Sequence, residues 1–330
     1  MPNDPGLAGD TCIFMEAVPG DGGAHNASGV WWLSPDINLT GPVSGPDKAD
    51  PGQNNPVQVK FHRKAASTGC VFPGAESITV QLWVGNPSLV MTPNNPASTA
   101  LVQSIGSPLP AEGASAIQVM DWTPPPGLPP SDPQSSGHKC LMAICYPDNL
   151  APSPTSFFVP DDQHVAQHNI CVVPCGAPGA SLHPGLCGFK VTTINPNLHQ
   201  AQTVTLRAVV DLTPAGFVAH AVSTRVHGLH GFRQLGTALL RGGFRFDLSP
   251  LHAEQVTDHS RPGTSGPLPG GALHPRYEAK VRLAPGRAVD VRFIADLTGA
   301  HPGDAYIFHL TQLGADLRPQ GGMTLVMVAG

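Results

Sequence analysis

The stretch Val57-Gln58-Val59-Lys60-Phe61-His62 alternates apolar and polar side chains with a period of two residues. Successive side chains of a β-strand point to opposite faces, so this pattern predicts a strand with one buried and one exposed face. The pattern returns in residues 77–84, where Trp83 lies on the face opposite to Ile78, Val80, Leu82 and Val84. Two such segments near each other in the chain indicate a layered β-structure.

The composition of the whole chain favours short strands over helices. Of the 330 residues, 37 are glycine, 37 are proline and only 12 % are charged, whereas 41 % are hydrophobic. Proline blocks helix interiors, because it lacks the backbone N–H that a helix needs. A disordered chain would carry more charge and fewer aliphatic residues. We therefore expect an all-β protein whose short strands are joined by Gly/Pro turns.

The length and the distribution of strand patterns predict two tandem antiparallel β-sandwich domains of the immunoglobulin-like class. Residues 1–29 are expected to be an N-terminal segment, mostly loop. Residues 30–175 carry six or seven strand patterns and form the first predicted sandwich. A Gly/Pro-rich linker is expected at residues 176–188, and residues 189–330 form the second sandwich.

Some segments give more specific expectations. Residues 138–146 are strongly apolar from Cys140 onward, which predicts a central strand covered on both faces. Residues 164–173 are expected to form the last strand of the first sandwich. In the second sandwich, residues 277–283 alternate cleanly, and residues 217–226 are expected to form another strand.

The chain has seven cysteines, an odd number, so at least one thiol stays free or pairs with another chain. All of them precede residue 188. A disulfide between Cys175 and Cys187 would fasten the predicted linker and stabilise it by roughly 3 kcal/mol. Buried reduced cysteines that pack as small apolar side chains are the alternative.

All four tryptophans lie in the first half of the chain. Adjacent residues of a regular strand face opposite sides, so Trp31 and Trp32 cannot both point into a core there. Trp31, Trp32 and Trp83 are therefore candidates for a protein-interaction surface, where exposed tryptophan is an effective anchor. The alternative is that tryptophans fill the core of the sandwich.

Charge and targeting signals exclude several classes. The formal net charge is −5, and Arg63-Lys64 is the longest basic run, so the basic footprint of a nucleic-acid binder is missing. The N-terminus has no basic and apolar signal-peptide regions. No apolar run reaches the ~18–20 residues of a membrane helix. A cytoplasmic location and release by a non-classical route both stay open, and a signal removed from the sequence would also explain the pattern.

Histidines in the second half raise the question of a metal site. His227-Gly228-Leu229-His230 is accompanied by other imidazoles at His220, His252, His259 and His274. A metal needs three or four ligands that converge on one point. His227 and His230 would point to opposite faces of a strand, so scattered surface histidines are the preferred interpretation. No catalytic, cofactor-binding or metal-ligating residues are assigned, and His164 and His168 on one strand would stand about 13 Å apart.

The N-terminal half resembles bacterial immunoglobulin-like modules, in the company of the CARDB domains. The residues that carry this resemblance are Ser34-Pro35-Asp36-Ile37, Asn55-Pro56-Val57-Gln58-Val59, Val80-Gln81-Leu82-Trp83, Asp121-Trp122-Thr123-Pro124, Cys140-Leu141-Met142-Ala143 and Val165-Ala166-Gln167-His168-Asn169. The C-terminal half is similar, more loosely, to bacterial immunoglobulin-like end domains through its terminal hairpin at residues 302–324. The resemblance implies spacers, platforms and interaction surfaces.

The expected function is that of a non-enzymatic structural or interaction protein within a larger assembly or at a surface. Its expected partners are other protein subunits, including further copies of itself, without nucleic acid, cofactor or membrane insertion. A carbohydrate or small-ligand binding module is the first alternative, because sandwich loops support such sites. A metal-dependent hydrolase that uses the histidines of the second half is the other alternative.

Overall fold

The structure is a computed structural model of the whole chain. It describes residues 11–25, 29–40, 48–65, 68–70, 74, 77–93, 99–129, 132–135, 137–149, 157–176, 181–183, 185–226, 233–236, 240, 243–249, 256–258, 263–267 and 273–330.

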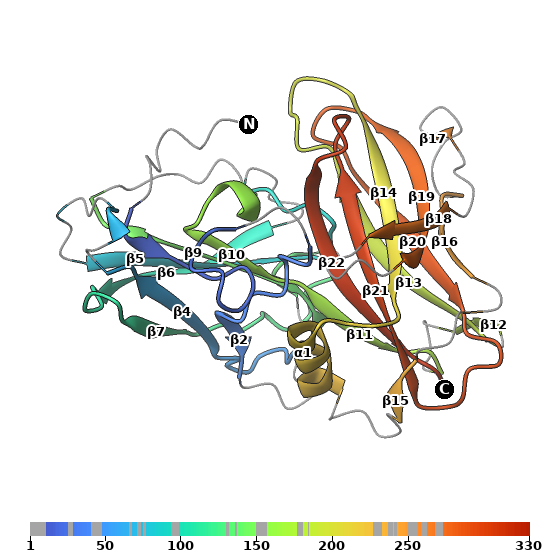
Figure 1. The fold of residues 1–330 in the computed structure, drawn as a ribbon, viewed down its shortest axis with the longest axis horizontal. Coiled ribbons are helices and arrows are strands. Elements are labelled where there is room, and N and C mark those ends of the chain that lie inside the picture. The colour runs from blue at the N-terminus through green and yellow to red at the C-terminus, as the bar shows by residue number, and fades with distance from the viewer. Residues whose placement is uncertain are drawn as a thin grey trace. The chain divides into compact units, whose positions relative to one another are not determined.

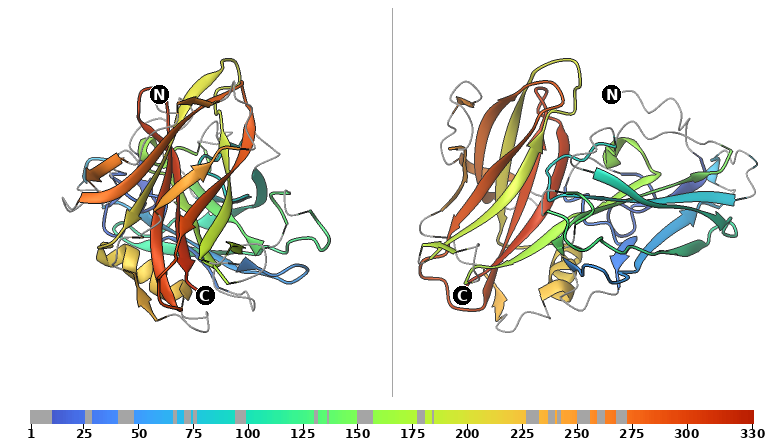
Figure 2. Two further views of the ribbon diagram at one scale, coloured as in Figure 1. Left: turned by 90° about the vertical axis from the view of Figure 1, so that its right-hand side faces the viewer. Right: turned by 180° about the vertical axis from the view of Figure 1, so that it is seen from behind.

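The described residues are almost entirely β-structure, as the composition predicts (Figures 1 and 2). The helices among them are the α-helix α1 (Gly216–Val226) and a 3-10 turn at Val159–Asp161. The strands form mainly antiparallel sheets that pack as sandwiches, which confirms the predicted fold class. No helix in the described ranges combines the length and the apolar character required to cross a bilayer.

The chain divides into two compact units. Unit 1 consists of Met1–Asn86 and Met91–Asn169, and unit 2 consists of Pro87–Val90 and Ile170–Gly330. The short segment Pro87–Val90 leaves unit 1 between two of its strands. There Leu89 is fully buried in the apolar core of unit 2, and its N–H donates to the carbonyl of Thr192.

Unit 1 contains two four-stranded sheets and one short strand pair (Figure 1). The first sheet has the order β1-β4-β2, with β7 also paired to β4; its strands are β1 (Ile13–Phe14), β2 (Ile37–Leu39), β4 (Val57–Arg63) and β7 (Ser115–Met120). The second has the order β10-β9-β5-β6; its strands are β5 (Ser77–Gly85), β6 (Thr99–Pro108), β9 (Cys140–Pro147) and β10 (Val165–His168). The short pair is β3 (Lys48–Ala49) with β8 (Gly137–His138).

The core of unit 1 lies between the apolar faces of these two sheets. Val57, Val59 and Phe61 point inward from β4 and are fully buried. They meet the inward face of β5, which consists of Ile78, Val80, Leu82 and Val84. Both alternating faces were predicted from the sequence. The prediction for residues 138–146 is also confirmed, because every residue of β9 is buried.

Unit 2 repeats the two-layer arrangement with longer strands. Its larger sheet has the order β11-β22-β21-β14-β19-β17, from strands β11 (Ile170–Pro174), β14 (Gln202–Asp211), β17 (Val256–Asp258), β19 (Leu273–Leu283), β21 (Asp304–Leu313) and β22 (Pro319–Val328). Two short strands attach to it, β15 (Gln234–Leu235) to β21 and β18 (Gly263–Pro267) to β19. The smaller sheet has the order β12-β13-β20-β16, from β12 (Ser181–His183), β13 (Leu186–Ile194), β16 (Phe244–Asp247) and β20 (Ala288–Asp296).

Aromatic rings fill the space between the layers of unit 2. Phe293 packs edge-to-face against Phe308 at 5.0 Å and against Phe246 at 5.6 Å between ring centroids. Such tilted pairs are the arrangement that the aromatic quadrupole favours. The sequence predicted strands for these phenylalanines and did not predict that they meet.

The change from unit 1 to unit 2 falls earlier than the sequence suggested. Residues 170–174 were expected in the first sandwich, but they form β11, which pairs in parallel with β22 of unit 2. The expected linker at 176–188 is not a free connection either, because Leu186–Gly188 already pair with β20. Alternation decides the placement of β11, since Cys171 and Val173 join the apolar core of unit 2.

Two local predictions need correction. Residues 217–226 were expected to form a strand but lie in α1, where Val218 and Val222 are buried one helical turn apart. Strand β6 was not predicted at all. On β5, Leu82 pairs with Gln103 and the next residue, Trp83, pairs with Leu101. Val102 of β6 is therefore an extra residue, a β-bulge that interrupts the alternation of β6.

Replacing Phe61 by alanine is expected to destabilise unit 1 by about 3–5 kcal/mol, because it leaves a cavity in a fully buried position. Thermal or urea unfolding measures this change. The matched control is Gln58→Ala on the half-buried opposite face of β4, with an expected effect within about 0.5 kcal/mol. Equal losses from the two variants would contradict the burial pattern.

Candidate functional site

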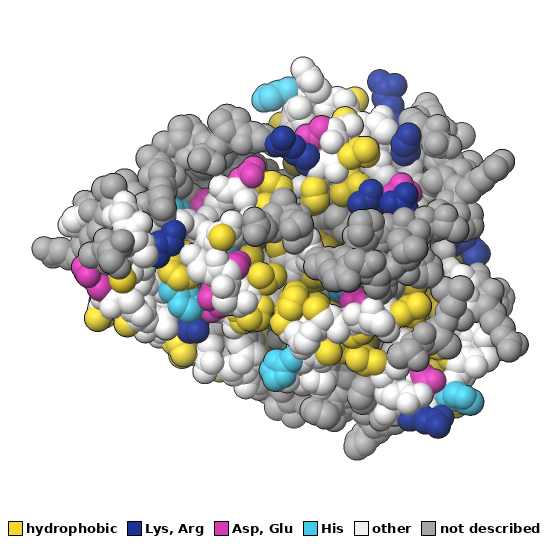
Figure 3. Space-filling view, in the orientation of Figure 1, with side chains coloured by type: hydrophobic (Ala, Val, Ile, Leu, Met, Phe, Trp, Pro, Cys, Tyr) yellow, Lys and Arg dark blue, Asp and Glu magenta, His cyan; other side chains and the backbone are white. Residues whose placement is uncertain are grey.

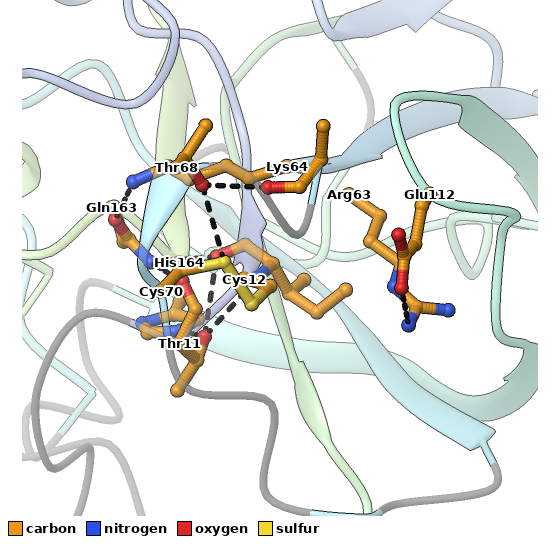
Figure 4. The surroundings of a disulfide bond; sticks show 11 residues. Thr11, Cys12, Arg63, Lys64, Thr68, Cys70, Glu112, Gln163 and His164 are labelled. Atoms are coloured by element: carbon orange, nitrogen blue, oxygen red, sulfur yellow. Dashed lines mark hydrogen bonds and ion pairs between the residues drawn. A yellow bond between two sulfur atoms is a disulfide. The ribbon is translucent and has the colours of Figure 1, made fainter.

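A disulfide joins the N-terminal segment to the chain that follows β4. Cys12 is bonded to Cys70, and Gln163 lies beside this link (Figure 4). The side-chain amide of Gln163 donates to the carbonyls of Thr11 and Ile13 at 2.6 and 2.9 Å. The ammonium of Lys64 donates to the same side chain at 3.0 Å. A segment expected to be mostly loop is thus held by covalent and hydrogen bonds.

Next to this disulfide, three side chains form a hydrogen-bonded chain. His164 Nδ1 lies 2.8 Å from Asp162 Oδ1. His164 Nε2 lies 2.5 Å from the hydroxyl of Thr11, which Figure 4 shows beside it. The order hydroxyl, imidazole, carboxylate is the order of a nucleophile with its base and orienting acid. Thr11, however, is only 2 % exposed, and its oxygen also contacts the main chain of Ile13. A nucleophile must reach a substrate, and the buried hydroxyl of Thr11 does not. We therefore interpret the three hydrogen-bonded side chains as stabilising the fold.

The same order of groups occurs in unit 2. His309 Nε2 lies 3.1 Å from Asp211 Oδ2, and its Nδ1 lies 3.1 Å from the hydroxyl of Thr324. All three residues are buried within the larger sheet. The polar atoms of such a buried chain satisfy one another, which buried polar groups require. Because the same hydrogen-bonded arrangement occurs twice and is buried each time, both arrangements are interpreted as structural.

Glu16, Asp36 and His62 bring metal-ligand atoms together in unit 1. One oxygen or nitrogen atom from each lies within 4.8 Å of the others. The buried carboxylate of Asp36 already accepts the N–H of Glu16 at 2.6 Å and contacts His62 Nε2 at 3.0 Å. The ammonium of Lys60 lies 4.0 Å from Asp36 Oδ1, and its positive charge would repel a metal cation bound there. We therefore interpret this cluster as a closed hydrogen-bonded bracket between the N-terminal segment and β4.

The structure corrects the expectation for the adjacent tryptophans. Trp31 and Trp32 are both buried, at 1 % and 3 % exposure, and their rings meet edge-to-face. They lie in a turn instead of a regular strand, so the alternation rule does not apply and both rings can point inward. Trp83 remains half-buried on the outer face of β5 and is the predicted interface tryptophan that stays accessible.

The cysteines resolve into two pairs and three thiols. Cys175 and Cys187, singled out from the sequence, are joined by a disulfide within unit 2. The pair Cys12–Cys70 could not be chosen from the sequence, because spacing alone does not fix connectivity. Cys140, Cys145 and Cys171 are buried thiols that form no disulfide. Burial raises the pKa of the Cys145 thiol, and the carboxylates of Asp36 and Asp162 raise it further.

The histidine hypotheses have different outcomes. His227 and His230 lie outside the described residues, and so do His252 and His259. His220 lies on α1, and the backbone of His274 lies in β19. The pair His164 and His168 does not converge on one point. His164 contacts Thr11 and Asp162, whereas His168 Nδ1 contacts the carbonyl of Ser34.

Two edge strands of unit 1, β6 in one four-stranded sheet and β7 in the other, have no charged residue. Each pairs on one side only in the described structure, β6 with β5 and β7 with β4. Their ten and six residues contain no Asp, Glu, Lys or Arg. The amide oxygen of Gln103 on β6 accepts the N–H of Asp121, just after β7, at 2.9 Å. We call these two strands the uncharged edge.

Apolar side chains on the uncharged edge face the solvent. Leu101 is 42 % exposed, Ile117 58 % and Val119 47 %. Ile117 lies opposite Lys60, and Val119 lies opposite Gln58, so both belong to the outer face of their sheet. Over the face drawn in Figure 3, charged side chains are scattered and do not gather in one patch. The free edge with its exposed apolar residues is therefore a distinctive surface of unit 1.

Thiol labelling tests the cysteine assignment. In the native, non-reduced protein we expect almost no reaction with Ellman's reagent at neutral pH, because the three thiols that form no disulfide are buried and the raised pKa keeps Cys145 protonated. Unfolding without reductant should expose three thiols, and reduction should expose all seven. A count of seven without reductant would contradict both disulfides.

Replacing Asp36 by alanine is expected to destabilise the protein by about 1–3 kcal/mol, because the buried N–H of Glu16 and the ring of His62 lose their partner. Urea unfolding gives the change in free energy. Asp148→Ala removes an exposed carboxylate that accepts a hydrogen bond from the hydroxyl of Ser77, so it serves as the control. An Asp36 variant as stable as this control would disprove the bracket.

Comparisons with known proteins give little guidance. No family model matches the chain, and no curated protein matches it. Among solved structures, the collagen adhesin CNA of S. aureus is 10 % identical, with a TM-score of 0.22 over 89 % of this chain and 93 % of that one. The red sea bream transglutaminase is 11 % identical, with a TM-score of 0.21 over 89 % and 31 %. The CupB6 tip adhesin of Pseudomonas aeruginosa is 8 % identical, with a TM-score of 0.17 over 89 % and 99 %. Likenesses this weak support no functional conclusion.

Proposed function

We propose that this protein is a non-enzymatic interaction module that joins other protein subunits by strand addition at the uncharged edge. In this mode, the main chain of an incoming strand pairs with the free N–H and C=O groups of the outermost strand. The partner subunit thereby extends the sheet. The observation that carries the proposal is the absence of charge along β6 and β7.

Free strand edges are normally protected against such pairing. Natural proteins place lysine, other charges, proline or bulges on them, because an unprotected edge pairs with other chains. β6 has proline only at its last residue, Pro108, and its bulge faces β5. β7 has neither proline nor charge and exposes Ile117 and Val119. An edge left open in this way is suited to pair with another strand.

The sequence of β7 favours a second copy of this chain as the partner. In an antiparallel pair related by a two-fold axis at Gln118, Ile117 would lie opposite Val119 of the partner subunit. The two glutamines would then face each other, and no like charges would meet. Cross-strand pairs of β-branched residues stabilise a sheet by roughly 0.2–1 kcal/mol each. Such an isologous contact closes a dimer.

The resemblance of residues 30–175 to CARDB-like modules, with a second immunoglobulin-like domain after them, agrees with this proposal. Modules of that kind mainly provide spacers, platforms and interaction surfaces. A two-sandwich building block would supply one such surface through its first unit.

Lysine substitutions on β7 should break the dimer. We expect light scattering after size-exclusion chromatography to give twice the chain mass for the natural protein and the monomer mass for the Ile117→Lys/Val119→Lys variant. The cause is like charge brought together across the two-fold axis. Circular dichroism should stay unchanged, because both side chains are exposed.

The matched control is Leu198→Lys, which changes a similarly exposed apolar residue of unit 2 that is not part of the uncharged edge. It should remain dimeric. A monomeric natural protein at concentrations near 100 μM, or a dimer that the β7 lysines leave intact, would refute the proposal.

A further inference from the structure

The half-buried Trp83 forms one wall of a pocket on the outer face of unit 1. The pocket has a volume of about 470 Å³, within the range of small-ligand sites. Pro93 and residues 99–101 at the start of β6 complete one side, and Pro125 and Leu128 lie on the loop that follows β7. The segment Asp132–Gln134 contributes the polar side.

The tryptophan ring is held in place by its neighbours. Its indole N–H donates to Gln81 Oε1 at 3.2 Å, and the ring of Phe157 packs against it edge-on at 5.2 Å. Gln81 is itself fixed, because its amide nitrogen contacts the hydroxyl of Tyr146 at 3.2 Å. A ring fixed before binding loses little conformational entropy when a ligand arrives.

The polar segment of the pocket is also fixed. The buried ammonium of Lys139 donates to the carbonyl of Asp132 at 2.9 Å, and the hydroxyl of Ser135 donates to the same carbonyl at 2.8 Å. The N–H of Gln134 donates to Asp132 Oδ1 at 2.8 Å. These contacts fix the main chain of Asp132 and Gln134 and one carboxylate oxygen of Asp132, and the side chain of Gln134 is exposed at the pocket.

The chemistry of this lining indicates the class of ligand. An aromatic ring beside proline and leucine side chains suits the apolar face of a saturated ring. A carboxylate accepts hydrogen bonds from hydroxyl groups, and an amide both donates and accepts. The described residues that line the pocket include neither lysine nor arginine, so none of them would neutralise a phosphate or carboxylate ligand.

We infer that the Trp83 pocket binds a neutral saccharide. The sugar ring would stack on Trp83, and its hydroxyl groups would bond to Asp132 and Gln134. A proline-rich peptide is disfavoured, because grooves for such peptides are lined by aromatic side chains, whereas Trp83 is the single aromatic residue in this lining. This inference rests on Trp83 and the Asp132–Gln134 segment and not on strand addition, although residues 99–101 of β6 belong both to the pocket and to the uncharged edge.

Saturation-transfer NMR with a panel of neutral and anionic oligosaccharides at millimolar concentration tests the inference. We expect transfer to at least one neutral member and none to its anionic counterparts. Titration with that sugar should quench the fluorescence of Trp83, since Trp31, Trp32 and Trp122 are buried. Trp83→Ala should weaken binding at least tenfold, and Trp83→Phe should restore part of it.

Further variants keep the test decisive if Trp83→Ala folds poorly. Gln134→Ala changes an exposed side chain, and Asp132→Asn keeps an oxygen for the N–H of Gln134, so both should fold and bind more weakly. Thr79→Ala alters the same face of β5 outside the pocket and should bind normally. Binding unchanged in the pocket variants, no transfer to any saccharide, or binding of a polyproline peptide instead would overturn the inference.

Discussion

The burial of alternating side chains between two β-layers is the constraint on which this structure depends. In unit 1, Phe61 and its neighbours on β4 meet the inward face of β5, and all of them are excluded from water. Shifting either strand by one residue would turn these apolar residues outward and the polar ones inward. Each layer thus fixes the register of the other.

A disulfide and buried hydrogen bonds attach the segment of unit 1 that is not held by the burial of alternating strand residues. The N-terminal segment has only two residues in a strand, yet the Cys12–Cys70 disulfide, the Thr11–His164–Asp162 chain and the Asp36 bracket attach it to unit 1. Groups that elsewhere perform catalysis or bind metals here satisfy one another in buried positions. Their environment decides their role, because the same side chains would be reactive only with access to a substrate or an ion.

The surfaces proposed for function arise where the layers end. In the described structure β6 and β7 each pair with a strand on one side only, neither carries a charged residue, and the carbonyl of Val119 on β7 accepts the side-chain amide of Gln118. On the outer face of β5, the residues that alternate away from the core include Trp83, which becomes a wall of the pocket. The alternation of side chains along the strands of unit 1 therefore produces both its buried core and the outward-facing residues of the proposed binding surfaces.

The sequence by itself determined the fold class and the buried faces of β4, β5 and β9, and it placed Trp83 on the opposite face of β5, because these follow from local periodicity. It could not show β6, since the bulge at Val102 breaks the period, nor the helix at 216–226, where two valines one turn apart reach the interior. Only the tertiary structure decided that Trp31 and Trp32 are buried, that β11 pairs with β22, and that Cys12 meets Cys70. Each of these depends on contacts between residues far apart in the chain, which no local pattern specifies.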